Sequence, residues 1–343
     1  MKIGRVGCLG IVLLVVLAMS VLLNVVLIVT KAASIGSRFA DNEPPKFDEA
    51  VIAEAKGVDG GKAPDTKIAV VHLRGIITAA EEGKLGETMV DDLKIQLEQA
   101  VADAKVKAIV LAIDSPGGEV TASDMIYTAV RRARDVGKKP VVVSMGSLAA
   151  SGGFYVACAG SHLIANETTI TGSIGVIMQG INYEQLFDKV GLRVTTFKSG
   201  AFKDVLSGAR TMTEDEKRYI QGLVMQTYDR FVGIVATERE LPEDQLRKGI
   251  ADGRVVSGKD AFAAKLVNQL GDVEDAYAKA MELGNAPGSK IVRYESGFDF
   301  GRLSQLLGRT ARHTTKLEVS VAEVLTPKLE MGKLYYLPSY YAP

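Results

Sequence analysis

The sequence predicts an α/β fold with a parallel sheet at its centre. After residue 66, short apolar runs rich in Val, Ile and Leu recur, and helical patterns separate them. Continuous apolar runs indicate strands that are buried on both faces, as in parallel sheets covered by helices. The expected strands are residues 67–74, 106–114, 140–146, 162–166, 172–179 and 192–198.

Two helices have clear start signals. Thr213 and Glu216 form a capping box, and apolar residues at helical spacing follow as far as Val235. A second helix is expected from Ser257 to a stop at Gly271. Residues 253–259 match the first part of a phosphate-binding loop, but Asp260 stands where that loop needs Ser or Thr, so we interpret them as a turn into the second helix.

Composition excludes several classes of function. The 343 residues are 47% hydrophobic, and 41 basic residues balance 41 acidic ones, so nucleic acid is not an expected partner. The two cysteines, Cys8 and Cys158, are too few and too far apart for a disulfide framework or a zinc site, and both are interpreted as buried thiols. No cofactor and no metal are expected.

The N-terminal segment has the pattern of a membrane anchor. Residues 6–29 carry no charge, and as a helix they would exceed the ~30 Å hydrocarbon core of a bilayer. A cleavable signal peptide is the main alternative, but its apolar core would be only about 7 to 15 residues long. Lys2 and Arg5 precede the span, which favours a cytoplasmic N-terminus. We therefore expect a cytoplasmic tip at 1–5, a single-pass anchor at 6–30 in the inner membrane, and a periplasmic remainder.

The remainder divides into three parts. Residues 31–65 are rich in Pro, Gly and charge without a sustained period, which predicts a linker. A folded domain is expected at 66–290. A C-terminal extension at 291–343 ends in the tyrosine-rich tail 332–343, which we expect to be extended.

Two glycine-containing motifs follow consecutive strands. In 149–153, AASGG, small residues surround Ser151, which fits a nucleophile that needs room as well as a tightly packed corner. In 114–119, DSPGGE, the glycines fit either a simple turn or a backbone that presents N–H groups to an oxyanion. The pair is more informative than either motif alone, because acyl transfer needs a nucleophile beside hydrogen-bond donors.

Histidine is not the expected base for Ser151. His72 and His162 lie within apparent strands among apolar neighbours, where an imidazole with a structural role is expected, and His313 has no metal-ligand spacing to the others. No GxSxG elbow and no SxxK motif surrounds Ser151.

With these motifs the chain resembles the membrane-anchored signal peptide peptidase A family of serine proteases, which are relatives of the Clp protease subunit and of the crotonase fold. The resemblance covers about residues 66–285. The stretches that carry it are DSPGGEV at 114–120, SMGSLAASGGFYVACAG at 144–160, TGSIGVI at 171–177, KSGAFKD at 198–204 and ADGRVVSGKDA at 251–261.

The resemblance implies a fold of repeated ββα units and a Ser-Lys dyad. Ser151 matches the nucleophile, Lys203 the general base, and Ser173 the residue that orients the lysine. Gly118, with Gly117 beside it, and the N–H of Gly152 match the oxyanion hole.

Lysine chemistry adds two expectations. A free lysine has a pKa of about 10.4, so Lys203 must be desolvated, with a pKa lowered by roughly two to three units, to accept a proton near neutral pH. A carboxylate beside the amine would raise that pKa, so we expect the Asp204 side chain to point away from the dyad.

The expected function is an endopeptidase that degrades cleaved signal peptides and other short apolar peptides, bound in extended form, through an acyl-enzyme. An acyl-CoA hydratase on the same fold and an inactive assembly scaffold are the alternatives. Because relatives form rings whose sites are built partly by neighbouring subunits, a homo-oligomer is expected. For the tail 334–343, occupation of a substrate groove and docking on the outside remain equally open.

Overall fold

A computed structural model describes residues 17, 19–24, 27, 47–57, 62–79, 88–295 and 334–336. The chain divides into two units, Met1–Pro45 and Lys46–Pro343. In the first unit, residues 19–24 are helical and exposed. No helix among the described residues is both long and apolar enough to cross a bilayer. The predicted tip at 1–5 and most of the predicted anchor at 6–30 lie outside the described residues.

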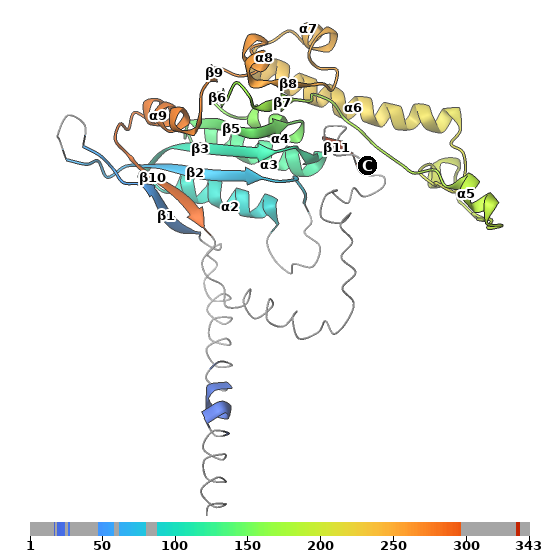
Figure 1. Ribbon diagram of the computed structural model, residues 1–343, viewed down its shortest axis with the longest axis horizontal. Helices are drawn as coiled ribbons and strands as arrows, with labels where there is room; N and C mark the ends of the chain where they lie inside the picture. The colour runs from blue at the N-terminus through green and yellow to red at the C-terminus, as the bar shows by residue number, and fades with distance from the viewer. Residues whose placement is uncertain are drawn as a thin grey trace, which may run out of the picture. The chain divides into compact units, whose positions relative to one another are not determined.

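The second unit is built on a mostly parallel sheet (Figure 1). Among the described residues the sheet has nine strands, in the order β1-β10-β2-β3-β5-β6-β9, with β7 paired to β5 and β8 paired to β7. All pairs are parallel except β1 with β10 and β7 with β8. The strands are β1 Asp48–Ala53, β2 Lys67–Arg74, β3 Val106–Ser115, β5 Val141–Ala150, β6 His162–Ala165, β7 Ile170–Gly172, β8 Val255–Ser257, β9 Gln269–Leu270 and β10 Lys290–Glu295.

A second, two-stranded sheet lies beside the first. Its members are β4, Gly118–Glu119, and β11, Tyr335–Tyr336, which pair antiparallel. The helices are α2 Met89–Ala102, α3 Val120–Asp135, α4 Gly152–Ala157, α5 Glu184–Lys189, the 3₁₀ helix η2 Ala201–Asp204, α6 Glu214–Arg239, α7 Glu243–Lys248, α8 Gly258–Ala263 and α9 Val273–Leu283.

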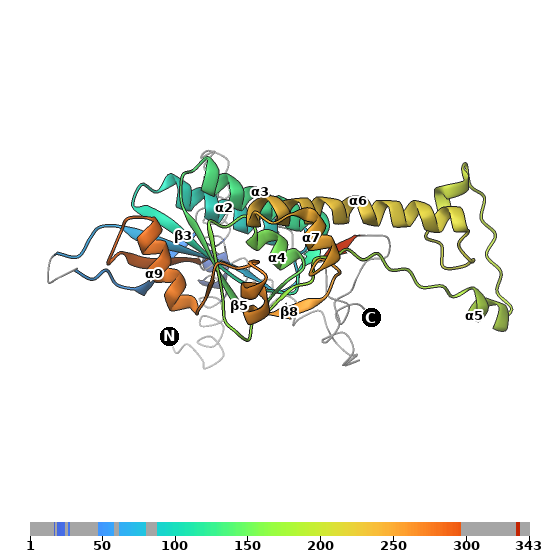
Figure 2. The same ribbon diagram turned by 90° about the horizontal axis from the view of Figure 1, so that it is seen from above.

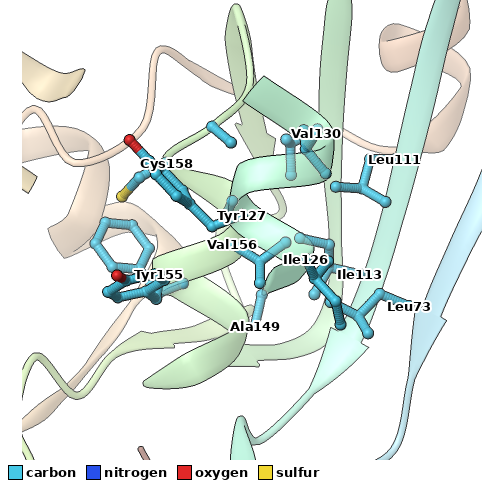
Figure 3. Packing of buried hydrophobic residues seen from close by; sticks show 14 of the residues in the cluster. Leu73, Leu111, Ile113, Ile126, Tyr127, Val130, Ala149, Tyr155, Val156 and Cys158 are labelled. Carbon is cyan, nitrogen blue, oxygen red and sulfur yellow. The ribbon is translucent and has the colours of Figure 1, made fainter. Parts of the chain in front are cut away.

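Both faces of the central strands are buried, as the continuous apolar runs predict. On β3, Ile109 and Leu111 face the larger core, which α2, α3 and α4 cover, whereas Ala108 and Val110 face α9. Figure 3 shows Ile126 and Val130 of α3 packed close to β3. Because side chains alternate along a strand, both sets must be apolar to pack under helices.

β5 carries the chain to the predicted nucleophile. Its first half pairs with β6, from Val142 to Met145, and its second half pairs with β7, from Leu148 to Ala150. On its other side it pairs with β3, and Ala149 lies opposite Ser115. This register places the end of β5 beside the turn that follows β3.

Three sequence predictions are corrected. Residues 192–198 form no strand, and the side chains of Leu192, Val194 and Phe197 are exposed instead of entering the sheet. The strand predicted at 172–179 does not form: the strand here is β7, Ile170–Gly172, and it ends where Gly172 and Ser173 both have positive φ, of 75° and 51°. The helix capped by Ser257 ends at Ala263, and the chain then enters β9.

The domain boundaries also differ from the expected ones. Residues 48–53, within the expected linker, form the edge strand β1. Its partner β10 begins at Lys290 and continues past the expected domain end. β1 begins with two acidic residues, Asp48 and Glu49, and lies between Pro-rich and Gly-rich stretches, which is why its composition resembled a linker.

Candidate active site

Ser151 lies at the junction of β5 and α4. Its φ is 53° and its ψ is −115°, a conformation that non-glycine residues rarely adopt. Its N–H donates to the Gly172 carbonyl at 2.8 Å. The Ser151 hydroxyl is buried and has no hydrogen-bond partner among the described residues. A buried, unpartnered hydroxyl held by a strained backbone is typical of a functional group, since a structural serine would satisfy its hydrogen bonds.

Glycines bring a second backbone segment against Ser151. A Cβ atom at Gly117, whose φ is 99°, would lie 2.5 Å from the Gly152 nitrogen, so no side chain fits there. A Cβ atom at Gly152 would lie 3.1 Å from the Gly118 nitrogen. The N–H of Gly117 donates to the Ser115 hydroxyl at 3.1 Å, so its role is conformational. The N–H groups of Gly118 and Gly152 are the candidate oxyanion donors.

Ser173 follows the strand end that pairs with the end of β5, next to Ser151. It follows Gly172, the residue whose carbonyl accepts the Ser151 N–H, and its own N–H donates to the Arg254 carbonyl at 2.8 Å. Ser173 is 3% exposed, and its φ is 51°. The structure therefore brings Ser151, Ser173 and the three glycines together.

Lys203 is not part of this group within one chain. It lies in η2, on the segment between β7 and α6, and it is exposed. Figures 1 and 2 both show this segment, which includes α5, extending along α6 away from β5 and α4. The described residues of its own chain therefore do not supply the desolvation expected of Lys203.

Asp204, the neighbour of Lys203, has other partners. Its carboxylate accepts hydrogen bonds from Arg210 Nη2 at 2.6 Å and from Lys198 Nζ at 2.7 Å. No ion pair joins it to Lys203 among the described residues. These bonds hold the pKa of the Asp204 carboxyl well below its usual range.

The tail lies against the glycines. Tyr336 of β11 is opposite Gly118, and the Tyr335 N–H and carbonyl both bond to Ile177, at 3.1 Å. Residues 334–336 thus run as a strand between β4 and Ile177. A Cβ atom at Gly117 would lie 2.1 Å from the Tyr336 carbonyl oxygen. The sequence left two positions open for the tail, a substrate groove and the outside of the domain. Residues 334–336 lie beside the predicted oxyanion glycines, as the first of these positions requires.

An aromatic pocket holds the Tyr336 side chain. The Tyr336 ring is stacked on Tyr155 at 5.0 Å between centroids and is tilted against Phe231 at 4.8 Å. The Tyr155 hydroxyl donates to Asp124 at 2.5 Å, and Arg230 binds the same carboxylate oxygen at 2.6 Å. No local sequence pattern indicates this pocket, because its residues are far apart along the chain.

The remaining candidates have structural surroundings. Burial raises the pKa of the Cys158 thiol to about 12, as expected for a buried thiol. Burial lowers the pKa of His72, but its buried Nδ1 has no hydrogen-bond partner among the described residues, so the satisfied imidazole expected there is not found. His162 Nε2 lies 3.2 Å from Gln269 Oε1. Cys8 and His313 lie outside the described residues. In the part of the chain that the structure describes, no three His, Cys, Asp or Glu residues gather as a metal site would require.

A serine at a strained strand-to-helix junction, beside backbone donors in the turn that follows the neighbouring parallel strand β3 and at the start of α4, is the arrangement of a serine hydrolase on an α/β fold of the Clp protease kind. The sequence model for Clp protease matches residues 65–171, and the model for peptidase family S49 matches residues 133–286. The chain belongs to peptidase family S49, the signal peptide peptidase A family of serine peptidases.

Three relatives support this assignment. A putative signal peptide peptidase SppA of Enterococcus faecium is 33% identical over 237 residues, which cover 68% of this chain and 68% of the relative. A putative protease of Synechocystis sp. is 40% identical over 193 residues, covering 56% of this chain and 69% of the relative. A putative protease of Methanocaldococcus jannaschii is 41% identical over 198 residues, covering 58% of this chain and 63% of the relative. The matched stretch thus spans about two thirds of each relative's length.

Proposed function

We propose that the chain is a membrane-anchored serine endopeptidase that degrades cleaved signal peptides and other short apolar peptides outside the cytoplasm. One observation carries the proposal: Ser151 has a buried hydroxyl without a hydrogen-bond partner among the described residues, and the next residue, Gly152, lies against the Gly118 nitrogen. Acyl transfer needs this combination of nucleophile and oxyanion donors.

The reaction follows from these roles. Lys203, as a neutral amine, accepts the Ser151 proton while the serine oxygen attacks the substrate carbonyl carbon, and Gly118 and Gly152 stabilise the oxyanion. The ammonium then protonates the leaving amine, which leaves an acyl-enzyme on Ser151. Water, deprotonated by the same amine, hydrolyses the ester and regenerates the serine. Ser173 orients the amine throughout.

In this proposal Lys203 comes from a neighbouring copy of the chain. Its exposure, its position on a segment that extends from the sheet, and the exposed Leu192, Val194 and Phe197 on that segment all favour an interface between copies. Burial in such an interface would supply the desolvation that a lysine base requires. In a closed ring every active site is complete, because each chain provides Lys203 to one neighbour and receives Lys203 from another.

The proposed substrate binds as an added strand. The tail already pairs with β4 and Ile177 in this manner, with an apolar aromatic pocket for one side chain. Strand addition uses backbone groups, so it tolerates many sequences, while the pocket selects apolar side chains. An anchor at 6–30 would hold the enzyme at the surface where apolar peptides accumulate.

Turnover by the full chain in detergent tests the proposal. With a fluorogenic apolar peptide, Ser151→Ala should lower kcat by about four orders of magnitude, because the nucleophile is lost. Ser144→Ala is the matched control, since Ser144 is a buried serine of the same strand, 7% exposed. A fluorophosphonate probe should label the unchanged chain and Ser144→Ala but not Ser151→Ala. Equal cleavage by Ser151→Ala and the unchanged chain would remove Ser151 from the mechanism and favour a scaffold.

A further inference from the structure

Arg210 binds the turn that carries Lys203 through three hydrogen bonds to Asp204. Arg210 donates from Nε to Asp204 Oδ2 at 3.0 Å and from Nη2 to Asp204 Oδ1 at 2.6 Å. Arg210 Nη2 also reaches the Asp204 carbonyl at 3.2 Å. A planar guanidinium that binds both the carboxylate and the backbone of one residue restricts position and orientation together. Lys203 immediately precedes that residue.

The same arginine is anchored to a rigid helix. Its Nη1 donates to Glu216 Oε2 at 2.9 Å and its Nη2 to Glu216 Oε1 at 2.6 Å. Glu216 lies in the first turn of α6, where it accepts the Thr213 N–H at 2.8 Å, and its side chain is only 5% exposed. Arg210 thus connects η2 to a helix of 26 residues.

Charge around the turn is balanced by the same contacts. The Asp204 side chain is 12% exposed and is shared between Arg210 and Lys198. The titratable and charged groups that contact the turn or its arginine are Lys198, Arg210, Glu216 and Tyr219, the last through its contact with Phe202. Tyr183 and Glu184 of the α5 region lie further along the segment, where they contact Gly208 and Thr211. An unbalanced carboxylate beside Lys203 would stabilise its ammonium form, which is inactive as a base.

We propose that Arg210 is a positioning residue for Lys203: it fixes the Ala201–Asp204 turn to α6 and occupies the Asp204 carboxylate so that the lysine amine has no anionic neighbour. The proposal rests on the proposed role of Lys203 as general base. It assigns a role in the reaction to a residue that touches neither the substrate nor Ser151.

Two expected results distinguish an Arg210 that positions Lys203 from an Arg210 that only stabilises the fold. In full-length Arg210→Gln, displacement of the amine should lower kcat by roughly 10 to 100-fold with KM little changed. The Asp204 carboxylate, which then keeps only Lys198 as a partner, should also raise the pKa of Lys203, so the acid limb of the kcat–pH profile should move up by about one unit. Adding Asp204→Asn to that variant should return the limb to its original pH, because the carboxylate that lost Arg210 is gone.

Two further variants complete the set. Arg210→Lys keeps the positive charge but loses the planar guanidinium that binds several oxygens at once, so kcat should fall while the acid limb stays at the same pH. This variant replaces Arg210→Gln in the experiment if Arg210→Gln does not fold. Arg218→Gln is the matched control, because Arg218 pairs with Asp215 on the exposed side of α6 and should leave both the rate and the limb unchanged.

A direct titration makes failure of this proposal distinguishable from failure of the proposed function. In the Ser151→Ala background, the rate of Lys203 acetylation by acetic anhydride, followed by peptide mass spectrometry against pH, reports the amine pKa without turnover. A higher Lys203 pKa in Arg210→Gln, reversed by Asp204→Asn, supports positioning. If Arg210→Gln leaves the Lys203 pKa and the acid limb unchanged while Lys203→Met is inactive, then Lys203 remains the base and only the role of Arg210 is overturned. Full activity of Lys203→Met instead overturns Lys203 as the base.

Discussion

Tyr336 lies opposite Gly118 in an antiparallel strand pair, with its ring stacked on Tyr155 at 5.0 Å between centroids. Gly118 and Gly152 are the candidate oxyanion donors, so this residue of the chain's own tail occupies the position proposed for a substrate residue. The enzyme and its tail are therefore expected to compete with added peptides for one groove.

Self-trimming is the first prediction from this relationship. A tail held beside Ser151 should be cleaved slowly by the active enzyme, so the intact mass of the unchanged chain should become smaller than that of Ser151→Ala after incubation. Truncation after residue 333 should also lower KM for an apolar peptide several-fold, because the competing strand is removed. Identical C-termini in both proteins, with an unchanged KM after truncation, would place the tail outside the catalytic cycle.

Complementation between inactive chains tests the shared site. Ser151→Ala lacks the nucleophile and Lys203→Met lacks the base, so neither should turn over peptide alone. If the lysine comes from a neighbouring copy, then mixing the two chains and allowing subunit exchange should restore activity, because some sites receive Ser151 from one chain and Lys203 from the other. A mixture that stays inactive although crosslinking shows mixed oligomers would place the dyad within one chain.

The local patterns predicted local structure well. β2 has the predicted bounds, Lys67–Arg74, and the caps at Thr213 and Ser257 are as expected, because strand periodicity and capping depend on neighbouring residues. The apolar pattern at 192–198 correctly signals side chains that favour burial, but it does not say against what. Among the described residues of one chain they join no sheet, so the strand prediction was wrong.

The site was predictable only where its parts are adjacent in sequence or recur in a family. Small residues around Ser151 and the glycines after β3 indicated a junction, and the register of β3 with β5 brings them together. The contacts of Tyr336 with Gly118 and of Asp124 with Tyr155 and Arg230 depend on tertiary packing between distant segments, which no local pattern encodes.

The buried Tyr155 hydroxyl should contribute to stability. It donates to Asp124 at 2.5 Å, and Tyr155 itself is fully buried. Tyr155→Phe removes a hydrogen bond to a charged group and should lower the free energy of unfolding by about 1.5 to 3 kcal/mol, measured by chemical denaturation. Tyr219→Phe is the control, because Tyr219 is 50% exposed, and it should change stability by less than about 0.5 kcal/mol. Equal stability of both variants would assign the Asp124 contact no net effect.

Membrane attachment is a separate prediction about the N-terminal unit. The full chain should remain in the membrane pellet after carbonate extraction, and a variant that lacks residues 1–30 should appear in the supernatant, because about 24 uncharged residues suffice to span a bilayer. Protease added to spheroplasts should digest the catalytic domain if that domain is periplasmic. A protected domain would reverse the proposed orientation, and a full chain released by carbonate would exclude an integral anchor.

The ion pairs of Arg210 with Asp204 and Glu216 predict how the free energy of unfolding depends on pH. Arg210 and the Thr213 N–H lower the pKa of Glu216 from 4.5 to about 2. A depressed carboxyl pKa stabilises the folded state above the unfolded value, and this contribution is lost as pH falls towards the folded value. The stability difference between the unchanged chain and Glu216→Gln should therefore be full above about pH 5 and shrink progressively down to about pH 2. Urea unfolding of both proteins across this range measures it, and a difference that stays constant with pH would show that the ion pair does not form in solution.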